Sequence, residues 1–322
     1  MESNIRIVYM GTPDFAVEPL RRLVEGGYNV VGVITMPDKA VGRSHSQLQA
    51  SPVKQYAVAH GLPVLQPEKL KDETFLSELR DWNADLQIVV AFRMLPEVVW
   101  DMPRLGTFNL HASLLPQYRG AAPINWAVIN GETETGITTF FLTHEIDTGE
   151  VIQQVRVPIT ENDNAGTVHD KLMMLGGDLV VDTVNALQNG TIKSIPQSEI
   201  KVDGELLPAP KIFKETCHIE WAQPLKKVYD FVRGLSPYPA AWTELQSTDE
   251  KRTTVKVYEA EMLPQAHDLL PGTIRTDGKS FLHIAAPGGF LVIKSLQISG
   301  KKRLNTDELL RGFKFAEGDR FC

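Results

Sequence analysis

Short apolar runs alternate with helical patterns through the first half of the chain, and this alternation restricts the fold more than any other feature. The β-rich runs are Ile5–Met10, Val30–Thr35, Pro63–Leu65, Leu86–Phe92 and Thr107–His111. Strand–helix alternation with short turns is typical of a parallel, doubly wound α/β sheet. In such a sheet ligands lie beyond the carboxyl ends of the strands, so we expect the functional residues there.

The pattern changes near residue 200. After a helix expected over residues 165–189, the segment Lys201–Lys211 combines two prolines, a glycine and several charges, which favours a linker. Five short β-rich runs follow and predict a small barrel or sandwich: Ala241–Leu245, Thr253–Ala260, Gly272–Arg275, Phe281–Ala285 and Phe290–Ser295. A chain of 322 residues is long enough for two domains. We predict them at 1–200 and 212–322, with the linker at 201–211.

Composition excludes several classes of protein. No apolar run approaches the roughly 18 residues of a membrane-spanning helix, and the first residues show neither the basic region nor the cleavage site expected of a secretory signal. The two cysteines, Cys217 and Cys322, cannot supply a disulfide framework or a cysteine-based metal site. The eight histidines show no metal-ligand spacing. We therefore expect a cytoplasmic protein with no membrane segment and no metal.

Charge is distributed unevenly along the chain. Residues 209–322 hold 17 Lys and Arg against 14 Asp and Glu, whereas residues 1–208 hold 16 against 26. A mildly basic C-terminal part can contact a polyanion, although a solvated surface explains so small an excess equally well. A polar loop expected over Pro37–Ser51 is unusually long for a compact domain, and loops of that length tend to be functional or mobile.

The stretch from Phe108 to Ile124 is the densest candidate for a functional site. Asn109 and His111 are two residues apart on a predicted strand, so their side chains share one face. Two polar side chains that project together need partners or a ligand. An amide can donate to a developing oxyanion, and an imidazole can exchange a proton near neutral pH. Taken singly, His111 could also be a hydrogen-bonded core histidine and Asn109 a turn former.

Asp147 is a weaker candidate. It lies in an Asp-Thr-Gly turn between two apolar runs that are typical of a hairpin or a crossing pair of strands. An aspartic protease would need a second such turn, and the sequence has none. Asp147 becomes important only if the fold brings it beside His111, because a carboxylate there would orient the imidazole and favour its charged form.

The turn Met10–Phe15 has one of the three glycines of a dinucleotide-binding fingerprint, and Pro13 removes an amide donor. Nucleotide binding is therefore not expected there. Two interpretations remain equally open: a tight strand–helix turn with Thr12 near the N-cap, or a contact with one end of a substrate.

These stretches together resemble the 10-formyltetrahydrofolate-dependent formyltransferase family. The resemblance rests on Asn109-Leu-His111, Ser113-Leu-Leu-Pro116, Arg119-Gly-Ala-Ala-Pro123 and Asp147-Thr-Gly149 at the family's spacing. It implies a Rossmann-like catalytic domain, then a linker and a small OB-like β-barrel. It also implies that Asn109, His111 and Asp147 are catalytic, without a metal. The co-substrate would be 10-formyltetrahydrofolate, contacted by Ser113, Leu114, Leu115 and Pro116, and less strongly by Phe92, Met94 and Leu95.

Within the family, the branch that formylates initiator methionyl-tRNA is the most similar, and the likeness spans nearly the whole chain. It implies transfer of the formyl group to the α-amino group of the tRNA-bound methionine, for translation initiation, by an enzyme expected to be a monomer. The expected tRNA contacts are basic residues: Lys39 and Arg43 in the long loop, then Lys211, Lys214, Arg233, Lys301, Lys302 and Arg303. Arg93 stands where a small or neutral residue is common, and the sequence alone offers no explanation for it.

Three alternatives stay open at this point. A formyltransferase acting on an amino-sugar nucleotide would keep the Asn, His and Asp residues but would need neither the long loop nor a basic C-terminal part. A non-catalytic RNA-binding protein would tolerate the loss of Asn109 and His111. A hydrolase that releases formate is a third, weaker alternative, which a formate assay separates.

Overall fold

A computed structural model describes residues 5–41 and 47–322 of the chain. It contains two compact units, each assembled from several chain segments. The first unit comprises Met1–Gly120, Thr135–Val157 and His169–Pro208, and the second comprises Ala121–Glu134, Pro158–Val168 and Ala209–Cys322. The division into 1–200 and 212–322 around a single linker stays a prediction.

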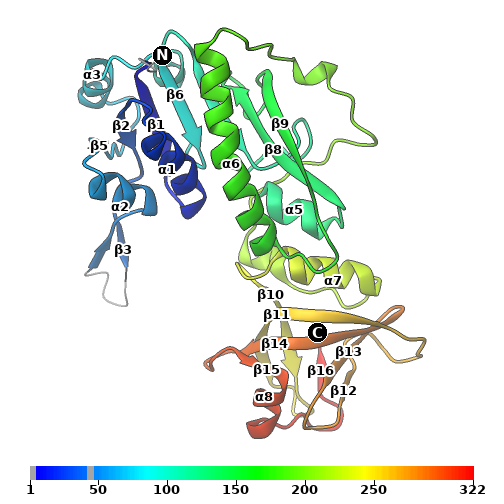
Figure 1. The fold of residues 1–322 in the computed structure, drawn as a ribbon. Coiled ribbons are helices and arrows are strands. Elements are labelled where there is room, and N and C mark those ends of the chain that lie inside the picture. Colours follow the sequence, from blue (N-terminus) through cyan, green and yellow to red (C-terminus); the bar gives the residue numbers. More distant parts are fainter. Residues whose placement is uncertain (1–4, 42–46) are drawn as a thin grey trace. The chain divides into compact units, whose positions relative to one another are not determined.

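The first unit is built on a seven-stranded sheet in the order β5-β2-β1-β6-β7-β8-β9 (Figure 1). Its strands are β1 (Ile7–Gly11), β2 (Val30–Ile34), β5 (Val64–Leu65), β6 (Leu86–Val90), β7 (Thr107–His111), β8 (Glu134–Phe141) and β9 (Val151–Pro158). The pairings from β5 to β7 are parallel, and β8 joins β7 in the antiparallel sense. The predicted doubly wound, mostly parallel sheet is therefore confirmed.

Helices cover both faces of this sheet. On one face, buried side chains of β1 pack against α3 (Glu73–Asp81) and α4 (Glu97–Trp100). On the other face lie α1 (Val17–Glu25) and the long α6 (Ala165–Gln188), which crosses the sheet in Figure 1. Arg22 of α1 forms an ion pair of 3.0 Å with Asp178 of α6, which ties these two helices together.

The strand order places a topological switch point beside β1. From β1 the chain adds β2 and then β5 on one side, and it returns to add β6 and β7 on the other. Ligands of open α/β sheets bind where the strand order reverses, outside the carboxyl ends of the strands. The ends of β1, β6 and β7 thus define where a site is expected.

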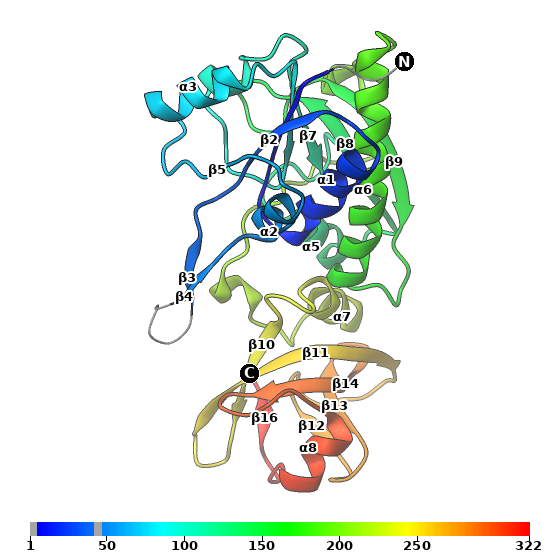
Figure 2. The ribbon, with the colours of Figure 1, turned by 60° about the vertical axis from the view of Figure 1, so that its left-hand side comes forward.

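The segment Pro37–Ser51 was expected to be one long polar loop, but its described part contains two short paired strands. β3 (Lys39–Val41) and β4 (Gln47–Gln49) pair in the antiparallel sense and extend away from the main sheet (Figure 2). The polar alternation of these short strands gave no core-facing pattern that would identify them. Arg43 and His45 lie outside the described residues.

Two polar contacts close the base of this β3–β4 arm. Lys54 of α2 (Pro52–Ala59) donates to Asp38 at 2.7 Å, and Thr35 and Ser51 share a hydrogen bond of 2.7 Å. Hydrogen bonds from Lys54 and Gln66 lower the pKa of Asp38 below its usual value. Residues on either side of the arm are therefore bonded to each other and fix where the arm leaves the sheet.

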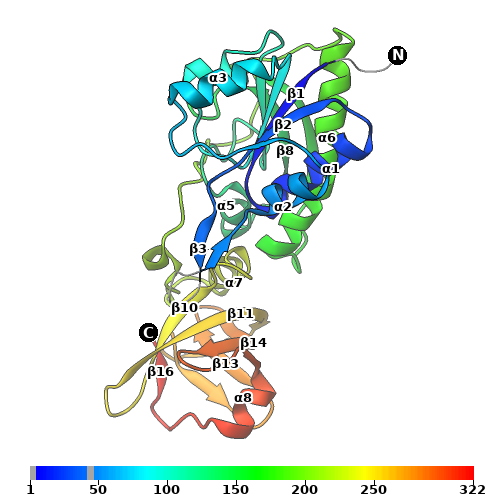
Figure 3. The same ribbon diagram turned by 90° about the vertical axis from the view of Figure 1, so that its left-hand side faces the viewer.

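The second unit contains an antiparallel sheet in the order β12-β13-β14-β11-β10-β16, with β15 paired to β14 (Figure 3). Its strands are β10 (Ala241–Gln246), β11 (Arg252–Pro264), β12 (Ile274–Thr276), β13 (Leu282–Ala286), β14 (Gly289–Ile298), β15 (Leu304–Asn305) and β16 (Arg320–Phe321). A bridge from Thr273 to Arg320 connects the two ends of the sheet. This nearly closed sheet confirms the predicted small OB-like barrel rather than a sandwich.

Helices complete the second unit. α7 (Leu225–Gly234) buries Leu225, Val228 and Val232 in the barrel core, and α5 (Pro123–Ile129) packs against α7. α8 (Thr306–Gly312) packs on β14 and β15. The sequence analysis missed α3, α4, α8, β15 and β16, because short elements carry few periods of a pattern. In the part of the chain that is described, no helix combines the length and the apolar character needed to cross a bilayer.

Gly272 offers a test of barrel closure. Its φ is +85°, and a Cβ atom there would lie 2.0 Å from the carbonyl oxygen of Phe321 in β16. Gly272→Ala should therefore lower the free energy of unfolding by about 2–4 kcal/mol. In the matched control Gly300→Ala, φ is +80° with no atom within 4 Å, so a loss of about 1 kcal/mol is expected. Equal losses in chemical denaturation of the two variants would contradict this account.

Candidate active site

Asn109 and His111 project from the same face of β7 at its carboxyl end. The strand is held between β6 and β8, where Asn109 is opposite Val89 and Phe140. Among the described residues, nothing hydrogen-bonds the Asn109 side-chain oxygen, although this atom is buried. Burying an amide oxygen without a hydrogen-bond partner lowers the stability of the fold, and an N–H group of a ligand could donate to it.

Both ring nitrogens of His111 face polar groups of the protein. Nε2 lies 2.9 Å from the carbonyl oxygen of Tyr118, and Nδ1 lies 3.8 Å from Oδ2 of Asp147. Because a carbonyl only accepts, this geometry places the hydrogen of the neutral ring on Nε2. Nδ1 is then the ring nitrogen without a hydrogen, and it faces the carboxylate of Asp147. Only 6% of His111 is exposed, so both contacts are shielded from bulk solvent.

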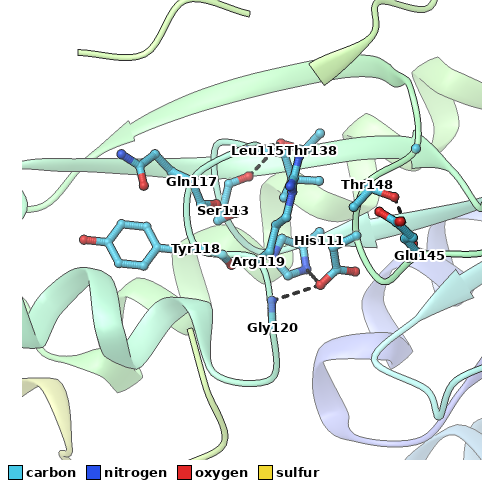
Figure 4. Close-up of polar contacts among 12 residues, drawn as sticks. His111, Ser113, Leu115, Gln117, Tyr118, Arg119, Gly120, Thr138, Glu145 and Thr148 are labelled. Atoms are coloured by element: carbon cyan, nitrogen blue, oxygen red, sulfur yellow. Dashed lines mark hydrogen bonds and ion pairs between the residues drawn. The ribbon is translucent and has the colours of Figure 1, made fainter. Parts of the chain in front are cut away.

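Asp147 comes from the turn between β8 and β9, and the fold brings it beside His111 as the sequence analysis required. The backbone N–H of Gly120 donates to Oδ2 of Asp147 at 3.0 Å, so the amide and the ring approach the same carboxylate (Figure 4). Asp147 has a φ of 55°, in the left-handed region that is sparsely populated by residues other than glycine. Strained backbone of this kind persists only where surrounding contacts hold it.

Gly149 explains why the turn has the sequence Asp-Thr-Gly. A Cβ atom at this position would lie 1.6 Å from the carbonyl oxygen of Phe141 at the end of β8. Any larger residue would push the two arms of the turn apart and displace Asp147. The glycine is thus required by a close backbone approach, which the sequence motif alone did not reveal.

The loop after β7 was predicted to contact a folate through Ser113, Leu114, Leu115 and Pro116. Ser113 donates through its hydroxyl to the carbonyl of Gln117 at 2.6 Å, and Leu115 is packed in a small core with Phe140 and Val151. Leu114 is partly buried and Pro116 is buried. The backbone of this loop is bonded to Thr138 and Gln154, so it is held rigidly near His111. Its contacts with a folate stay a prediction.

The loop after β6 carries the other predicted folate contacts. Met94 is 69% exposed, Phe92 is partly buried and Leu95 is buried in the core of the first unit. Arg93 now has a structural explanation. Its guanidinium donates to the carbonyl oxygens of Pro67 and Glu68, which ties this loop to the one after β5. Burial lowers the pKa of Arg93.

The turn after β1 does not follow the expected cap. Pro13 rather than Thr12 occupies the N-cap position of the short 3₁₀ helix Asp14–Ala16, and its side chain makes no capping bond. The hydroxyl of Thr12 is buried and has no partner among the described residues. Thr12 is therefore next to the N-cap residue but forms no capping bond, and its unsatisfied hydroxyl leaves the substrate-contact interpretation open.

The predicted tRNA contacts fall into different environments. Lys39 is exposed on β3, and Lys211, Lys214, Lys301, Lys302 and Arg303 are exposed in the second unit. Arg303 is paired with Glu259. The predicted tRNA contact of Arg233 is wrong. This residue is 7% exposed and is paired with Asp230 at 2.8 Å. Its guanidinium also donates to the carbonyl oxygens of Thr160 and Asp163. Its guanidinium holds the second unit together and is not accessible to a phosphate.

A pocket of about 430 Å³ in the second unit brings basic and aromatic side chains together. Its lining includes Lys211, Lys214 and Lys256 together with Phe213, Tyr238 and Trp242. Phe213 and Tyr238 are largely exposed. Lysines that neutralise phosphates, next to aromatic rings on which bases stack, are the usual components of a single-stranded nucleic-acid site.

The sequence analysis missed residues that support the site. Arg119 was noted only as part of a motif, and Gln197 was not considered, yet Gln197 bonds to the Asp147 turn and Arg119 bonds to Gln197. Gln197 lies far from the motif along the chain, in a segment without periodic pattern. Only the three-dimensional fold shows that this segment returns to the site.

Comparison with protein families defines the class of this chain. The formyl transferase family matches residues 4–184, and the formyl transferase C-terminal domain family matches residues 211–314. The chain therefore belongs to the formyl transferase family.

Individual relatives are similar to this chain over most of its length. The chain is 72% identical to the methionyl-tRNA formyltransferase of Bacteroides fragilis, over 98% of this chain and 97% of the relative. Solved structures below 20% identity share the fold. HypX from Aquifex aeolicus, in complex with tetrahydrofolic acid, has a TM-score of 0.65 over 98% of this chain and 49% of its own. WlaRD, a sugar 3N-formyl transferase, has a TM-score of 0.63 over 92% and 99%.

Gly149 should be essential for the geometry of the site. Gly149→Ala is expected to lower kcat for formyl transfer on the order of 10- to 100-fold, because a displacement of Asp147 by about 1 Å suffices for such a loss. Gly312→Ala, where no atom lies within 4 Å of the added Cβ, is the control and should keep wild-type activity. Wild-type kcat in the Gly149 variant would refute the close-approach argument.

Proposed function

We propose that this chain transfers the formyl group of 10-formyltetrahydrofolate to the α-amino group of methionine on initiator methionyl-tRNA. The observation that supports this proposal is a chain 72% identical to a methionyl-tRNA formyltransferase along nearly its whole length, in which His111 lies 3.8 Å from Asp147 and shares β7 with Asn109. A product used in translation initiation makes the cytoplasm the expected place of action.

Asn109 has the chemistry to stabilise the transition state. When the amine attacks the formyl carbon, a C–N bond forms and negative charge develops on the formyl oxygen. The side-chain N–H of Asn109 can donate to that oxygen, and a fixed donor of this kind contributes about 3 kcal/mol in related acyl transfers. Its buried, unpartnered Oδ1 can accept an N–H of the attacking amine, which would orient the nucleophile.

His111 and Asp147 have the chemistry to manage the protons. The attacking amine must lose one proton, and N10 of the folate must gain one as its bond to the formyl carbon breaks. Nδ1 of His111 is the free ring position, since Nε2 is occupied by the Tyr118 carbonyl. Asp147, 3.8 Å away, stabilises a proton on this nitrogen, and the charged ring can also support the oxyanion.

The folate is proposed to lie against the loops after β6 and β7, through Phe92, Met94, Leu95 and residues Ser113–Pro116. Both loops follow strands next to the topological switch point, the position at which open α/β sheets bind ligands. The loop after β7 is fixed by side-chain bonds from Thr138 and Gln154 to its backbone. A rigid backbone of this kind can present N–H and C=O groups to a pterin without further ordering.

The tRNA is proposed to contact the exposed basic residues of both units. The pocket lined by Lys211, Lys214 and Lys256 supports this assignment because it joins three lysines with accessible aromatic rings. Lys39 on the β3–β4 arm is also exposed. An amino-sugar nucleotide is too small to need either feature, which favours the tRNA over the sugar as acceptor.

The deciding experiment offers 10-formyltetrahydrofolate with one of two acceptors, charged initiator tRNA or an amino-sugar nucleotide. Formyl transfer to the tRNA alone is expected. Transfer to the sugar alone would overturn the proposed acceptor, and release of free formate without transfer would indicate a hydrolase.

Removing the side chain of Asn109 or His111 should lower the rate of formyl transfer without changing the affinity for tRNA. Asn109→Ala and His111→Ala are each expected to lower kcat by about 100-fold or more, because each removes a group that acts on the reacting atoms. Affinity for tRNA should change little. Asn189→Ala, at the exposed end of α6, is the control. Undiminished transfer by both site variants would refute the assignment of Asn109 and His111 as catalytic residues, and the absence of transfer in the wild type would support a non-catalytic RNA-binding protein.

The basic pocket predicts a particular salt dependence. The double variant Lys211→Ala/Lys214→Ala should weaken tRNA binding and reduce the slope of log K against log salt by about one for each phosphate that is no longer neutralised. Lys279→Ala, on an exposed turn of the second unit outside the pocket, should leave the slope unchanged. If both variants show the same slope of log K against log salt, the pocket does not contact the tRNA.

A further inference from the structure

Gln197 occupies an unusual position behind the Asp147 turn. It is 4% exposed and opens a short 3₁₀ helix, Gln197–Glu199, far along the chain from the other site residues. Its side-chain N–H groups donate to the carbonyl oxygens of Asp147 and Gly149, both at 2.8 Å. Its side-chain oxygen accepts two bonds from Arg119, at 3.0 and 2.6 Å. A carboxamide offers two donors and two acceptor positions, and all four are used here.

We propose that Gln197, together with Arg119, is a positioning residue that holds Asp147 against His111. This inference rests on the proposed function, since it concerns the same reaction. Gln197 donates hydrogen bonds to two backbone carbonyl oxygens of the turn, one on each side of Thr148. Through Arg119 it is also linked to Gly120, whose N–H binds the Asp147 carboxylate from the other side. Figure 4 shows Arg119 and Gly120 next to His111.

The backbone conformation of Asp147 explains why the turn needs these two hydrogen bonds. Its left-handed φ of 55° is unfavourable for an aspartate, so the free turn would relax toward other conformations. The carboxylate lies 3.8 Å from Nδ1 of His111, too far for a hydrogen bond, so the pair does not fix itself. Two bonds to the turn's own carbonyls select the conformation that directs the carboxylate at the ring.

The segment that carries Gln197 is itself fixed to the sheet. Ile195, two residues earlier, exchanges two backbone hydrogen bonds of 2.8 Å with Val151 in β9. Gln197 therefore approaches the turn from a rigid support rather than from a free loop. This arrangement lets a residue outside the motif act on the geometry of the catalytic pair without touching substrate.

Gln197→Glu is the most specific test. The substitution keeps the size of the side chain and the oxygen that accepts from Arg119, but it replaces the two N–H donors. A carboxylate would face two carbonyl oxygens and release the turn. We expect kcat to fall on the order of 10- to 100-fold, with dissociation constants for folate and tRNA within about twofold of wild type. The matched control is Gln153→Glu, because Gln153 in β9 accepts a bond from Thr183, which a carboxylate can also accept. It should keep wild-type kcat.

A double-mutant cycle separates positioning from general support of the fold. If Gln197 acts through Asp147, Gln197→Ala should cost little, less than about twofold, once Asp147→Ala is already present. In single-turnover measurements an equal loss in the presence and absence of Asp147 would overturn the proposal, as would full activity of Gln197→Glu.

Arg119→Lys keeps the inference testable if the Gln197 variants unfold. It retains the charge but loses the two-pronged bond to the Gln197 oxygen, so a smaller fall in kcat with the same dependence on Asp147 is expected. Its additivity with Asp147→Ala would overturn the proposal. The proposed function fails separately, if wild-type protein does not formylate charged initiator tRNA; an active wild type with active Gln197 variants refutes only this inference.

Discussion

The antiparallel addition of β8 to β7 is the constraint on which the site depends. His111 ends β7 opposite Thr138, and the chain then leaves β8 through the turn that contains Asp147. This pairing brings the turn from one stretch of chain near the imidazole from another, and the bonds from Gly120 and Gln197 then hold the Asp147 turn there. A carboxylate that is mostly removed from water needs compensation, which the Gly120 amide and the imidazole supply. The proximity of the proposed catalytic pair thus depends on sheet register.

The loops around this pair are ordered by polar side chains bonded to backbone, not by apolar packing alone. Thr138 and Gln154 bind the loop after β7, Arg93 binds the loop after β5, and Gln197 binds the Asp147 turn. Each bond fixes a carbonyl that would otherwise be free to rotate. Preorganised dipoles cost no reorganisation during reaction, which is how such sites stabilise charge. The rigidity of the site therefore comes from a distributed set of hydrogen bonds.

Much of the fold followed from pattern, because buried parallel strands stand out in the sequence as apolar runs with turns between them. Asn109 and His111 could be placed on one face because strand periodicity is two. The approach of Asp147 to His111 could be stated only as a condition, since it depends on the pairing of β8. Gln197 could not be found at all, and Arg233 was misassigned, because charge in a sequence does not show that a guanidinium is buried and saturated.

The assignment of residues Ala121–Glu134 to the second compact unit has a consequence for fragments of this protein. α5 lies within the stretch matched by the N-terminal family, yet its Ile129 packs on the core of the barrel unit and Asn125 bonds to Gly234 at the end of α7. Cleavage at residue 208 would leave the C-terminal piece with an uncovered apolar surface on α7. The second compact unit therefore depends on residues 121–134 as well as on the C-terminal stretch, and a C-terminal fragment that begins at residue 209 is expected to be less stable than the same unit in the whole chain.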